Sequence, residues 1–345
     1  MLRLSELLRV NATLDQDGRS HLADAAAAKW RIPAGAARFW RSSASHVFVV
    51  PAGVPAATRY LRFVPRDAPE AAKLERAARV MEAWSERGLS VARPVPSRAG
   101  RLTEQVETDD GAVVAMVVPA VAGQALSVEG LRPEQAYAWG SALARLHATN
   151  VEAALDDVSL PGSSPWRADD APFSDAVTAL YEEMRRWPAG DDRVGTIHGD
   201  FELDNLRFDN AGPTAFDADE TRRDWFAADI ASAVRDLTDP RTADVTEPSL
   251  FEAFLSGYRR SRHFGTEEES RLPLHAAAFA ARSVVELDGV IDAGSASSDP
   301  AWLIDLRAAL VRHQERGRSL VLAQAERLSR RTHRRGGTRV LARRG

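Results

Sequence analysis

The chain has 345 residues, of which 44% are hydrophobic and 27% charged, a balance typical of a globular protein with room for two lobes of ordinary domain size. It contains no cysteine, which excludes a disulfide framework, a thiolate metal site and a cysteine nucleophile. The formal net charge is −4 and no apolar run approaches the ~20 residues that span a bilayer, so we expect a cytoplasmic protein without nucleic-acid or membrane partners.

Residues 1–34 are predicted to be helical, and residues 35–119 to form a small sheet with one helix. The amphipathic stretch His21–Trp30 predicts a helix that packs on this sheet and ends near Pro33. Short β-prone runs separated by turn residues predict the strands. The strands are expected at Ala37–Trp40, His46–Val50, Thr58–Val64, Arg101–Thr108 and Ala112–Val118, and the helix at Ala68–Arg87.

Residues 120–329 are predicted to be mainly helical, apart from short strands around residue 200. Apolar residues recur at helical spacing in several segments. These helices are expected at Pro133–Asn150, Phe173–Trp187, Phe251–Arg260, Glu267–Val290 and Trp302–Arg327. Residues 330–345 are rich in arginine and contain Gly336 and Gly337, which predicts a basic flexible tail.

The stretch from Thr196 to Asp219 carries the polar residues that point most directly to chemistry. Asp200 follows a short apolar run, Asn205 comes five positions later, and a second apolar run leads to Asp217 after a turn. Because each lies at the end or bend of a short strand, two carboxylates and one amide can converge on a single point. Phosphoryl transfer needs such a set, since a base must orient the attacking hydroxyl and hard oxygen ligands must hold Mg²⁺.

The pattern His-Gly-Asp-x4-Asn, followed by an apolar residue and Asp-x-Asp, resembles the catalytic core of the aminoglycoside phosphotransferase and choline kinase family of small-molecule kinases. His-Gly-Asp alone is a weak signal because Asp, Asn and Gly are common in turns, so the full order and spacing carry the resemblance. It implies an α+β, protein-kinase-like fold with a small antiparallel-sheet N-lobe and a larger, mainly helical C-lobe. It also implies Asp200 as the catalytic base, Asn205 and Asp217 as Mg²⁺ ligands, and ATP or GTP as co-substrate.

The resemblance also assigns roles in the small lobe. Family members carry a strand cation that grips the nucleotide phosphates, usually a lysine, but the only lysines here are Lys29 and Lys73. We therefore expect Arg62, in the third strand, to take this role, because a guanidinium is a planar bidentate donor; an exposed strand arginine is the competing interpretation. Glu75, on the following helix, is the expected partner of that cation, and a solvated helix face explains it about as well.

Further positions follow from the resemblance. Ser43 lies in the glycine-free turn where kinases carry their phosphate-covering loop. Met116 and Val118 lie in the expected hinge between the lobes, where they either line the nucleotide pocket or belong to the strand core. His198 is expected to shape the catalytic loop, and Asp229 to support it by accepting hydrogen bonds from its backbone.

The acids Glu202, Asp219 and Glu220 make the mouth of the expected site acidic, which favours a cationic hydroxyl acceptor such as an aminoglycoside or an amino alcohol. The same acids can instead pair with nearby arginines. The favoured function is thus ATP- or GTP-dependent transfer of the γ-phosphoryl group to a hydroxyl of a small molecule. A catalytically weak, kinase-like nucleotide-binding module is the alternative, favoured by the missing strand lysine, and a metal-dependent phosphohydrolase would need more metal ligands.

Overall fold

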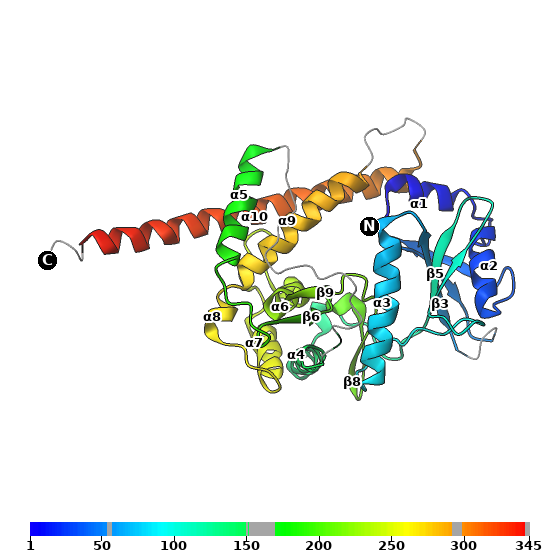
Figure 1. Cartoon of the computed structure of the whole chain (residues 1–345), viewed down its shortest axis with the longest axis horizontal. Helices are drawn as coiled ribbons and strands as arrows, with labels where there is room; N and C mark the ends of the chain where they lie inside the picture. The colour runs from blue at the N-terminus through cyan, green and yellow to red at the C-terminus, as the bar shows by residue number, and fades with distance from the viewer. Residues whose placement is uncertain (54–56, 150, 152–169, 292–298, 342–345) are drawn as a thin grey trace.

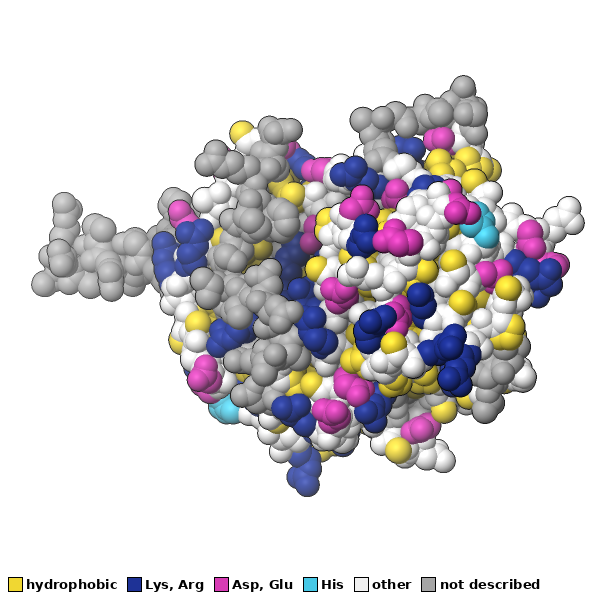
Figure 2. All heavy atoms as spheres, turned by 45° about the vertical axis from the view of Figure 1, so that its right-hand side comes forward, with side chains coloured by type: hydrophobic (Ala, Val, Ile, Leu, Met, Phe, Trp, Pro, Cys, Tyr) yellow, Lys and Arg dark blue, Asp and Glu magenta, His cyan; other side chains and the backbone are white. Residues whose placement is uncertain are grey.

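The computed structural model describes residues 1–53, 57–149, 151, 170–291 and 299–341. An antiparallel sheet flanked by helices forms the N-terminal lobe, and a mainly helical region forms the C-terminal lobe (Figure 1). This arrangement confirms the predicted fold class. Figure 2 shows acidic and basic side chains interspersed on one face of the molecule, so charge is not gathered by sign on that face.

The small lobe is built on a five-stranded antiparallel sheet in the order β1-β2-β3-β5-β4. Its strands are β1 (Arg38–Ser42), β2 (His46–Val50), β3 (Arg59–Pro65), β4 (Thr103–Val106) and β5 (Val113–Pro119). Successive side chains of a strand point to opposite faces, so Leu61 and Phe63 enter one core and Val64 enters another. Arg62, in register with Met116, shares the second face, from which it reaches the large lobe.

An N-terminal helical segment packs on the sheet. It consists of α1 (Leu4–Asn11), whose Leu4 and Leu7 join the core on the second face, and of α2 (His21–Ala27) and the 3₁₀ turn η1 (Ala28–Trp30), which cover the first face. Leu22 and Trp30 pack in one core with Phe48 of β2, and the Trp30 indole donates a hydrogen bond to the carbonyl of Val95 at 2.7 Å. Leu22 and Trp30 thus attach the amphipathic stretch to the sheet.

A longer helix, α3 (Pro69–Glu86), packs against the second face of the sheet. Its buried residues Leu74, Ala78, Met81 and Trp84 recur every three or four positions, which gives the helix one continuous apolar face. That face joins the core shared with the large lobe, so α3 links the two lobes.

The large lobe is assembled mainly from helices. They are α4 (Pro133–His147), α5 (Ala171–Met184), α6 (Phe226–Ala233), α7 (Pro248–Arg259), α8 (Thr266–Glu269), α9 (Leu272–Val290) and α10 (Ala301–Leu341). Two glycines let α4 and α7 approach backbone to backbone. A Cβ at Gly140 would lie 1.9 Å from the Phe254 carbonyl oxygen, and one at Gly257 would lie 2.0 Å from that of Tyr137. Neither position accommodates a side chain without separating the helices.

The last helix, α10, is about 60 Å long by helical rise and projects beyond the lobe (Figure 1). The helix includes residues 330–341 of the segment predicted to be a flexible basic tail, and residues 342–345 lie outside the described part of the chain. Within the described ranges, no helix combines the length and the apolar character needed to cross a membrane.

Candidate active site

Two short antiparallel strand pairs in the large lobe position the polar residues of the predicted catalytic stretch. The first pair is β6 (Val194–Ile197) with β9 (Arg222–Trp225), and the second is the hairpin of β7 (Leu206–Asp209) with β8 (Gly212–Ala215). Because Ile197 is in register with Arg222, the loop that follows β6 meets the loop that precedes β9. At Gly199 this approach is so close that a Cβ would lie 2.3 Å from the carbonyl oxygen of Glu220.

The structure places Asp200, Asn205 and Asp217 close together. The Asn205 side-chain amide donates hydrogen bonds to Asp200 Oδ2 at 2.8 Å and to the Asp200 carbonyl at 3.0 Å. Asn205 ends the 3₁₀ turn η4 (Leu203–Asn205), and its carbonyl accepts a hydrogen bond at 3.1 Å from the N–H of Phe216, the residue before Asp217. Asp217 has a φ of +63°, a left-handed conformation that is costly for a non-glycine residue and typical of functional sites.

Asp229, buried on α6, binds the backbone of the loop that follows β6. Its carboxylate accepts hydrogen bonds from the N–H groups of His198 and Gly199, both at 2.8 Å, and contacts the His147 ring at 2.9 Å. Burial would raise the pKa of Asp229, but these hydrogen bonds and the nearby imidazoles hold that pKa below its ordinary value. The Tyr258 hydroxyl contacts the other ring nitrogen of His147 at 2.8 Å, so the ring is fixed on both sides.

Asp229→Asn should lower the free energy of unfolding by about 1–3 kcal/mol, because an amide cannot accept all three hydrogen bonds and leaves buried donors unsatisfied. Urea unfolding followed by circular dichroism measures this change. Asp239→Asn is the matched control, since Asp239 also accepts hydrogen bonds from two backbone N–H groups, but in an exposed turn. Equal losses in the two variants would contradict the supporting role of Asp229.

Arg235 binds the Asp200 carboxylate from a second element. It begins the 3₁₀ turn η5 (Arg235–Leu237), which follows α6, and pairs with Asp200 Oδ1 at 3.0 Å and with Glu202. Burial raises the pKa of Asp200, and the Arg235 charge opposes that rise. Burial and the Asp200 charge together raise the pKa of Glu202 to about 7. The two acids therefore depend on one guanidinium for charge compensation.

Arg62 is buried between β3 and the large lobe. Its Nη2 lies 2.5 Å from an Asp219 oxygen and 3.0 Å from an Asp217 oxygen, and its Nε donates a hydrogen bond to the Ser45 hydroxyl at 3.1 Å. Burial raises the pKa of Asp219 to about 6, although Arg62 lowers it in part. Arg41 of β1 approaches the other oxygen of Asp217 at 3.5 Å. The predicted strand cation thus reaches the expected metal ligand directly.

The helix next to β3 contributes a lysine to this network. Lys73 of α3 pairs with Glu220 of the large lobe at 2.8 Å. Glu75, the predicted partner of Arg62, is half-buried on the same helix. Within the described part of the chain, the acids paired with Arg62 come from the large lobe instead. Charge is therefore distributed differently from the prediction, with cations on the small lobe and acids on the large lobe.

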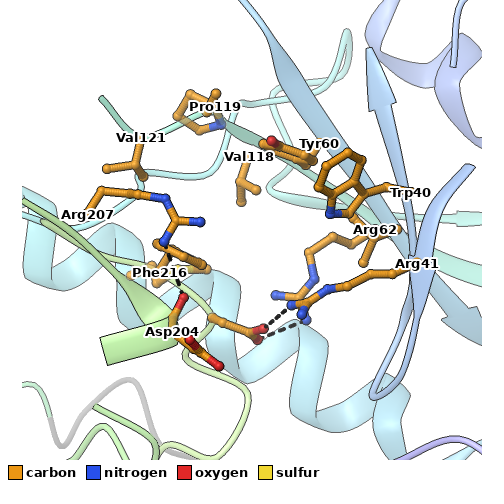
Figure 3. A pocket seen from close by; sticks show the side chains of 14 residues that line it. Trp40, Arg41, Tyr60, Arg62, Val118, Pro119, Val121, Asp204, Arg207 and Phe216 are labelled. Carbon is orange, nitrogen blue, oxygen red and sulfur yellow. Dashed lines mark hydrogen bonds and ion pairs between the residues drawn. The ribbon is translucent and has the colours of Figure 1, made fainter. Parts of the chain in front are cut away.

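A cavity of about 180 Å³ opens between the lobes beside these ion pairs. Figure 3 shows Trp40 and Tyr60 on the small-lobe side and Arg207 and Phe216 across from them. The Arg207 guanidinium lies over the Phe216 ring, 5.0 Å from its centroid. One end of the cavity thus offers flat aromatic and cationic surfaces, and the other offers the charged groups around Asp217.

The predicted pocket residues lie at different depths. Val118 lines the cavity, whereas Met116 is fully buried in the core that contacts α3. Ser43 lies in the bend between β1 and β2, where its carbonyl accepts a hydrogen bond from the N–H of Leu2 at 2.9 Å. Of the serines in this bend, Ser45 is the one whose hydroxyl contacts the strand arginine.

Asn205 and Asp217 offer oxygen atoms for a divalent cation. The Asn205 amide nitrogen faces Asp200, which directs its Oδ1 away from that carboxylate. Nearby, Asp219 Oδ1 is buried without a hydrogen-bond partner among the described residues. Those residues contain no group of three or more His, Asp or Glu side chains suited to a metal. Mg²⁺ commonly takes one or two protein ligands and completes its shell with phosphate oxygens and water, so the residues fit Mg²⁺ bound together with a nucleotide.

Comparison with known proteins identifies the family. Residues 39–272, which include both strand pairs and the lining of the cavity, match the family described as the phosphotransferase enzyme family. The chain belongs to this family. Amicoumacin kinase of Bacillus subtilis (strain 168) is 26% identical over 157 residues, which cover 42% of this chain and 46% of that protein. The matched part thus spans about half the length of this curated relative.

Several solved structures share this fold. An amicoumacin kinase in complex with AMP-PNP and Ca²⁺ superposes with a TM-score of 0.70 at 17% identity, covering 90% of this chain and 95% of that chain. A microcompartment-associated aminopropanol kinase has a TM-score of 0.63 at 20% identity, covering 89% and 96%. Spectinomycin phosphotransferase in complex with ADP and spectinomycin has a TM-score of 0.61 at 12% identity, covering 89% and 98%. At these identities the likeness shows the shared fold alone.

Sequence reasoning missed several residues of the site. Phe216 could have been found, because it immediately precedes Asp217, and Trp40 because it precedes the serine-rich turn. Arg235 carries no comparable signal: it is one arginine among many, and only the fold brings it to Asp200.

Proposed function

We propose that this protein transfers the γ-phosphoryl group of ATP or GTP to a hydroxyl group of a small molecule, with Mg²⁺ as cofactor. The observation that carries the proposal is the direct contact between Asp200 and Asn205, next to a cavity that Arg62 and Asp217 share. Membership of the phosphotransferase enzyme family supports it.

Under this proposal Asp200 is the catalytic base. Its carboxylate accepts a hydrogen bond from the acceptor hydroxyl and thereby directs the hydroxyl oxygen toward the γ-phosphorus. The contacts of Arg62 described above use Nη2 and Nε, so Nη1 is the donor we assign to the nucleotide phosphates. Mg²⁺, when held by Asn205 and Asp217, neutralises phosphate charge. Because the transition state of phosphoryl transfer is loose, positioning and charge supply most of the rate enhancement.

We assign the aromatic end of the cavity to the nucleotide base. Trp40 lines this end with 61% of its surface exposed, and its ring meets Tyr60 edge-on at 6.5 Å between centroids. A large exposed indole in a cavity gains apolar contact when a flat ring covers it, and stacking of a base on an aromatic side chain contributes ~1–3 kcal/mol.

Trp40→Ala should raise the dissociation constant of the Mg²⁺–ATP complex by about tenfold, which corresponds to ~1.4 kcal/mol of lost stacking. Isothermal titration calorimetry measures the constant directly. Trp302→Ala is the control, because Trp302 is also exposed but lies on α10, outside the cavity. An unchanged affinity of Trp40→Ala for the Mg²⁺–ATP complex would contradict the assignment of the nucleotide base to this end of the cavity.

The acceptor is proposed to be a hydroxylated small molecule, with amino alcohols and aminoglycosides as the first candidates. The acids expected to attract a cation are each paired with a basic side chain of the protein. The pairs are Glu202 with Arg235, Asp219 with Arg62, and Glu220 with Lys73. A cationic acceptor therefore gains less binding free energy from these acids than it would gain from acids without a basic partner. Binding of the amine must be measured separately from turnover.

An acceptor screen tests the proposed function. The protein is incubated with Mg²⁺, ATP or GTP, and a panel of hydroxylated amines and antibiotics, and released nucleoside diphosphate and product mass are measured. We expect release that depends on one acceptor class and a mass gain of one phosphoryl group. Nucleotide binding without turnover on any acceptor would instead favour a catalytically weak nucleotide-binding module.

A further inference from the structure

Arg235 lies directly beside the catalytic carboxylate, in a place that the nucleotide and metal roles do not explain. Its Nη1 is 3.0 Å from Asp200 Oδ1, and its Nη2 pairs with Glu202. Its guanidinium carbon lies 5.9 Å from the ring centroid of Phe279 on α9. A carboxylate and an aromatic ring thus hold the guanidinium, while one of its nitrogens is directed at Asp200.

The two oxygens of Asp200 have different partners. Asn205 donates to Oδ2 at 2.8 Å, and Arg235 donates to Oδ1 at 3.0 Å. The terminal torsion of an aspartate is broad, so a single donor defines the carboxylate plane poorly. Two directional donors on different oxygens define that plane. Because each carboxylate oxygen has two lone pairs, both can still accept a hydrogen bond from the acceptor hydroxyl.

We propose that Arg235 is a positioning residue that orients the Asp200 carboxylate toward the acceptor hydroxyl, and that Glu202 holds Arg235 in place. The inference rests on the proposed function, since it assigns Arg235 to the same reaction. Arg235 lies outside the set of residues that line the nucleotide cavity. Its loss should therefore appear in kcat and leave nucleotide affinity unchanged.

Arg235→Ala should lower kcat on the order of 10²-fold, the cost of a small misplacement of a reacting group. The dissociation constant of Mg²⁺–ATP, measured by calorimetry, should stay within about twofold of the wild type, because ground-state nucleotide binding is not involved. Guanidinium ion added at a non-denaturing concentration should restore part of kcat, since it can refill the position beside Asp200. Arg235→Lys should retain part of kcat, because it keeps the cation but loses the planar, two-nitrogen geometry.

Glu202 supplies a second test. Glu202→Gln leaves Arg235 in place but removes its charged partner, so kcat should fall less than in Arg235→Ala. Combining the two changes should cost no more than Arg235→Ala alone, because residues that act through one another are not additive. A double variant whose kcat loss equals the product of the single losses would show that Glu202 acts independently and would overturn its assigned part.

Arg259→Ala is the matched control. Arg259 of α7 pairs with Glu269 at 2.5 Å, and its guanidinium lies 5.8 Å from the Phe264 ring. Its side chain is 32% exposed, against 36% for Arg235. The control therefore removes an arginine with the same kinds of contact but no link to Asp200, and kcat should be unchanged and insensitive to guanidinium ion.

The possible results separate the two proposals. A wild-type kcat in Arg235→Ala, a loss that guanidinium ion does not restore, or an equal loss in Arg259→Ala would each overturn the positioning role while the wild type remains active. If the wild-type protein neither phosphorylates an acceptor nor hydrolyses ATP, the proposed function fails, and the role of Arg235 fails with it.

Discussion

Asp200→Asn should reduce kcat by about 10²–10⁴-fold, the usual contribution of a positioned base. The amide keeps the size of the side chain but cannot accept the proton or the charged hydrogen bond of the acceptor hydroxyl. Affinity for Mg²⁺–ATP should remain close to the wild-type value, because Asp200 is not among the residues that line the nucleotide cavity. Steady-state kinetics with the acceptor found by the screen, together with calorimetry, measure both quantities.

Asp209→Asn is the control for this experiment. Asp209 ends β7, is exposed, and accepts a hydrogen bond from the N–H of Ala211, so it is an acid of the same hairpin region without a place in the site. Its kcat should match the wild type. A wild-type kcat in Asp200→Asn would contradict the role of Asp200 as the catalytic base.

Arg62→Ala should lower the free energy of unfolding by about 3–5 kcal/mol, because it leaves the buried Asp219 without its cation, beside Asp217, which keeps only its 3.5 Å contact with Arg41. Urea unfolding measures the loss. Mg²⁺ should recover more stability in this variant than in the wild type, because a divalent cation can neutralise the two carboxylates in place of the guanidinium.

Arg93→Ala tests whether burial causes this effect. Arg93 binds Glu82 through two hydrogen bonds at 2.6 and 2.7 Å, but its side chain is 55% exposed, against 7% for Arg62. Exposed pairs contribute ~0–1 kcal/mol, so Arg93→Ala should change stability by no more than that. Similar losses in the two variants would contradict the assignment of Arg62 to a buried, charge-dependent cluster.

Much of the site could be predicted because it lies in one short stretch of chain. Asn205 and Asp217 are joined by the local β7–β8 hairpin, Asp200 lies five positions before Asn205, and local pairing is what sequence patterns describe best. The strand at His46–Val50 and the apolar face of α3 could be predicted for the same reason, since alternation and helical spacing are properties of neighbouring residues.

The contacts that could not be predicted join distant parts of the chain. Arg62 and Asp219 are 157 positions apart, and Lys73 and Glu220 are 147 apart. Helical spacing could identify the buried apolar face of α3, but it could not predict which charged residues of the large lobe lie next to this helix. The prediction of Glu75 as the partner of the strand cation therefore depended on analogy, whereas the fold brings a lysine of the same helix to an acid.

The alternation of side chains along β5 could not predict which residues of this strand border the cavity. Met116 and Val118 lie on the same face of β5, as a period of two requires, yet only the second borders the cavity. The alternation of side chains predicts the face of the sheet on which a residue lies. It does not predict whether that residue packs against a helix or borders a cavity.

The ion pairs described above between the two lobes each have their cation on the small lobe and their acid on the large lobe. They are Arg62 with Asp217, Arg62 with Asp219, Arg41 with Asp217, and Lys73 with Glu220. The last two are partly open to water, so dissolved ions weaken them more than they weaken the buried pair of Arg62 with Asp219. We therefore expect the attraction between the two lobes to weaken as the ionic strength rises. Under the proposed function, release of the nucleoside diphosphate requires the lobes to separate, so its rate should increase with salt concentration.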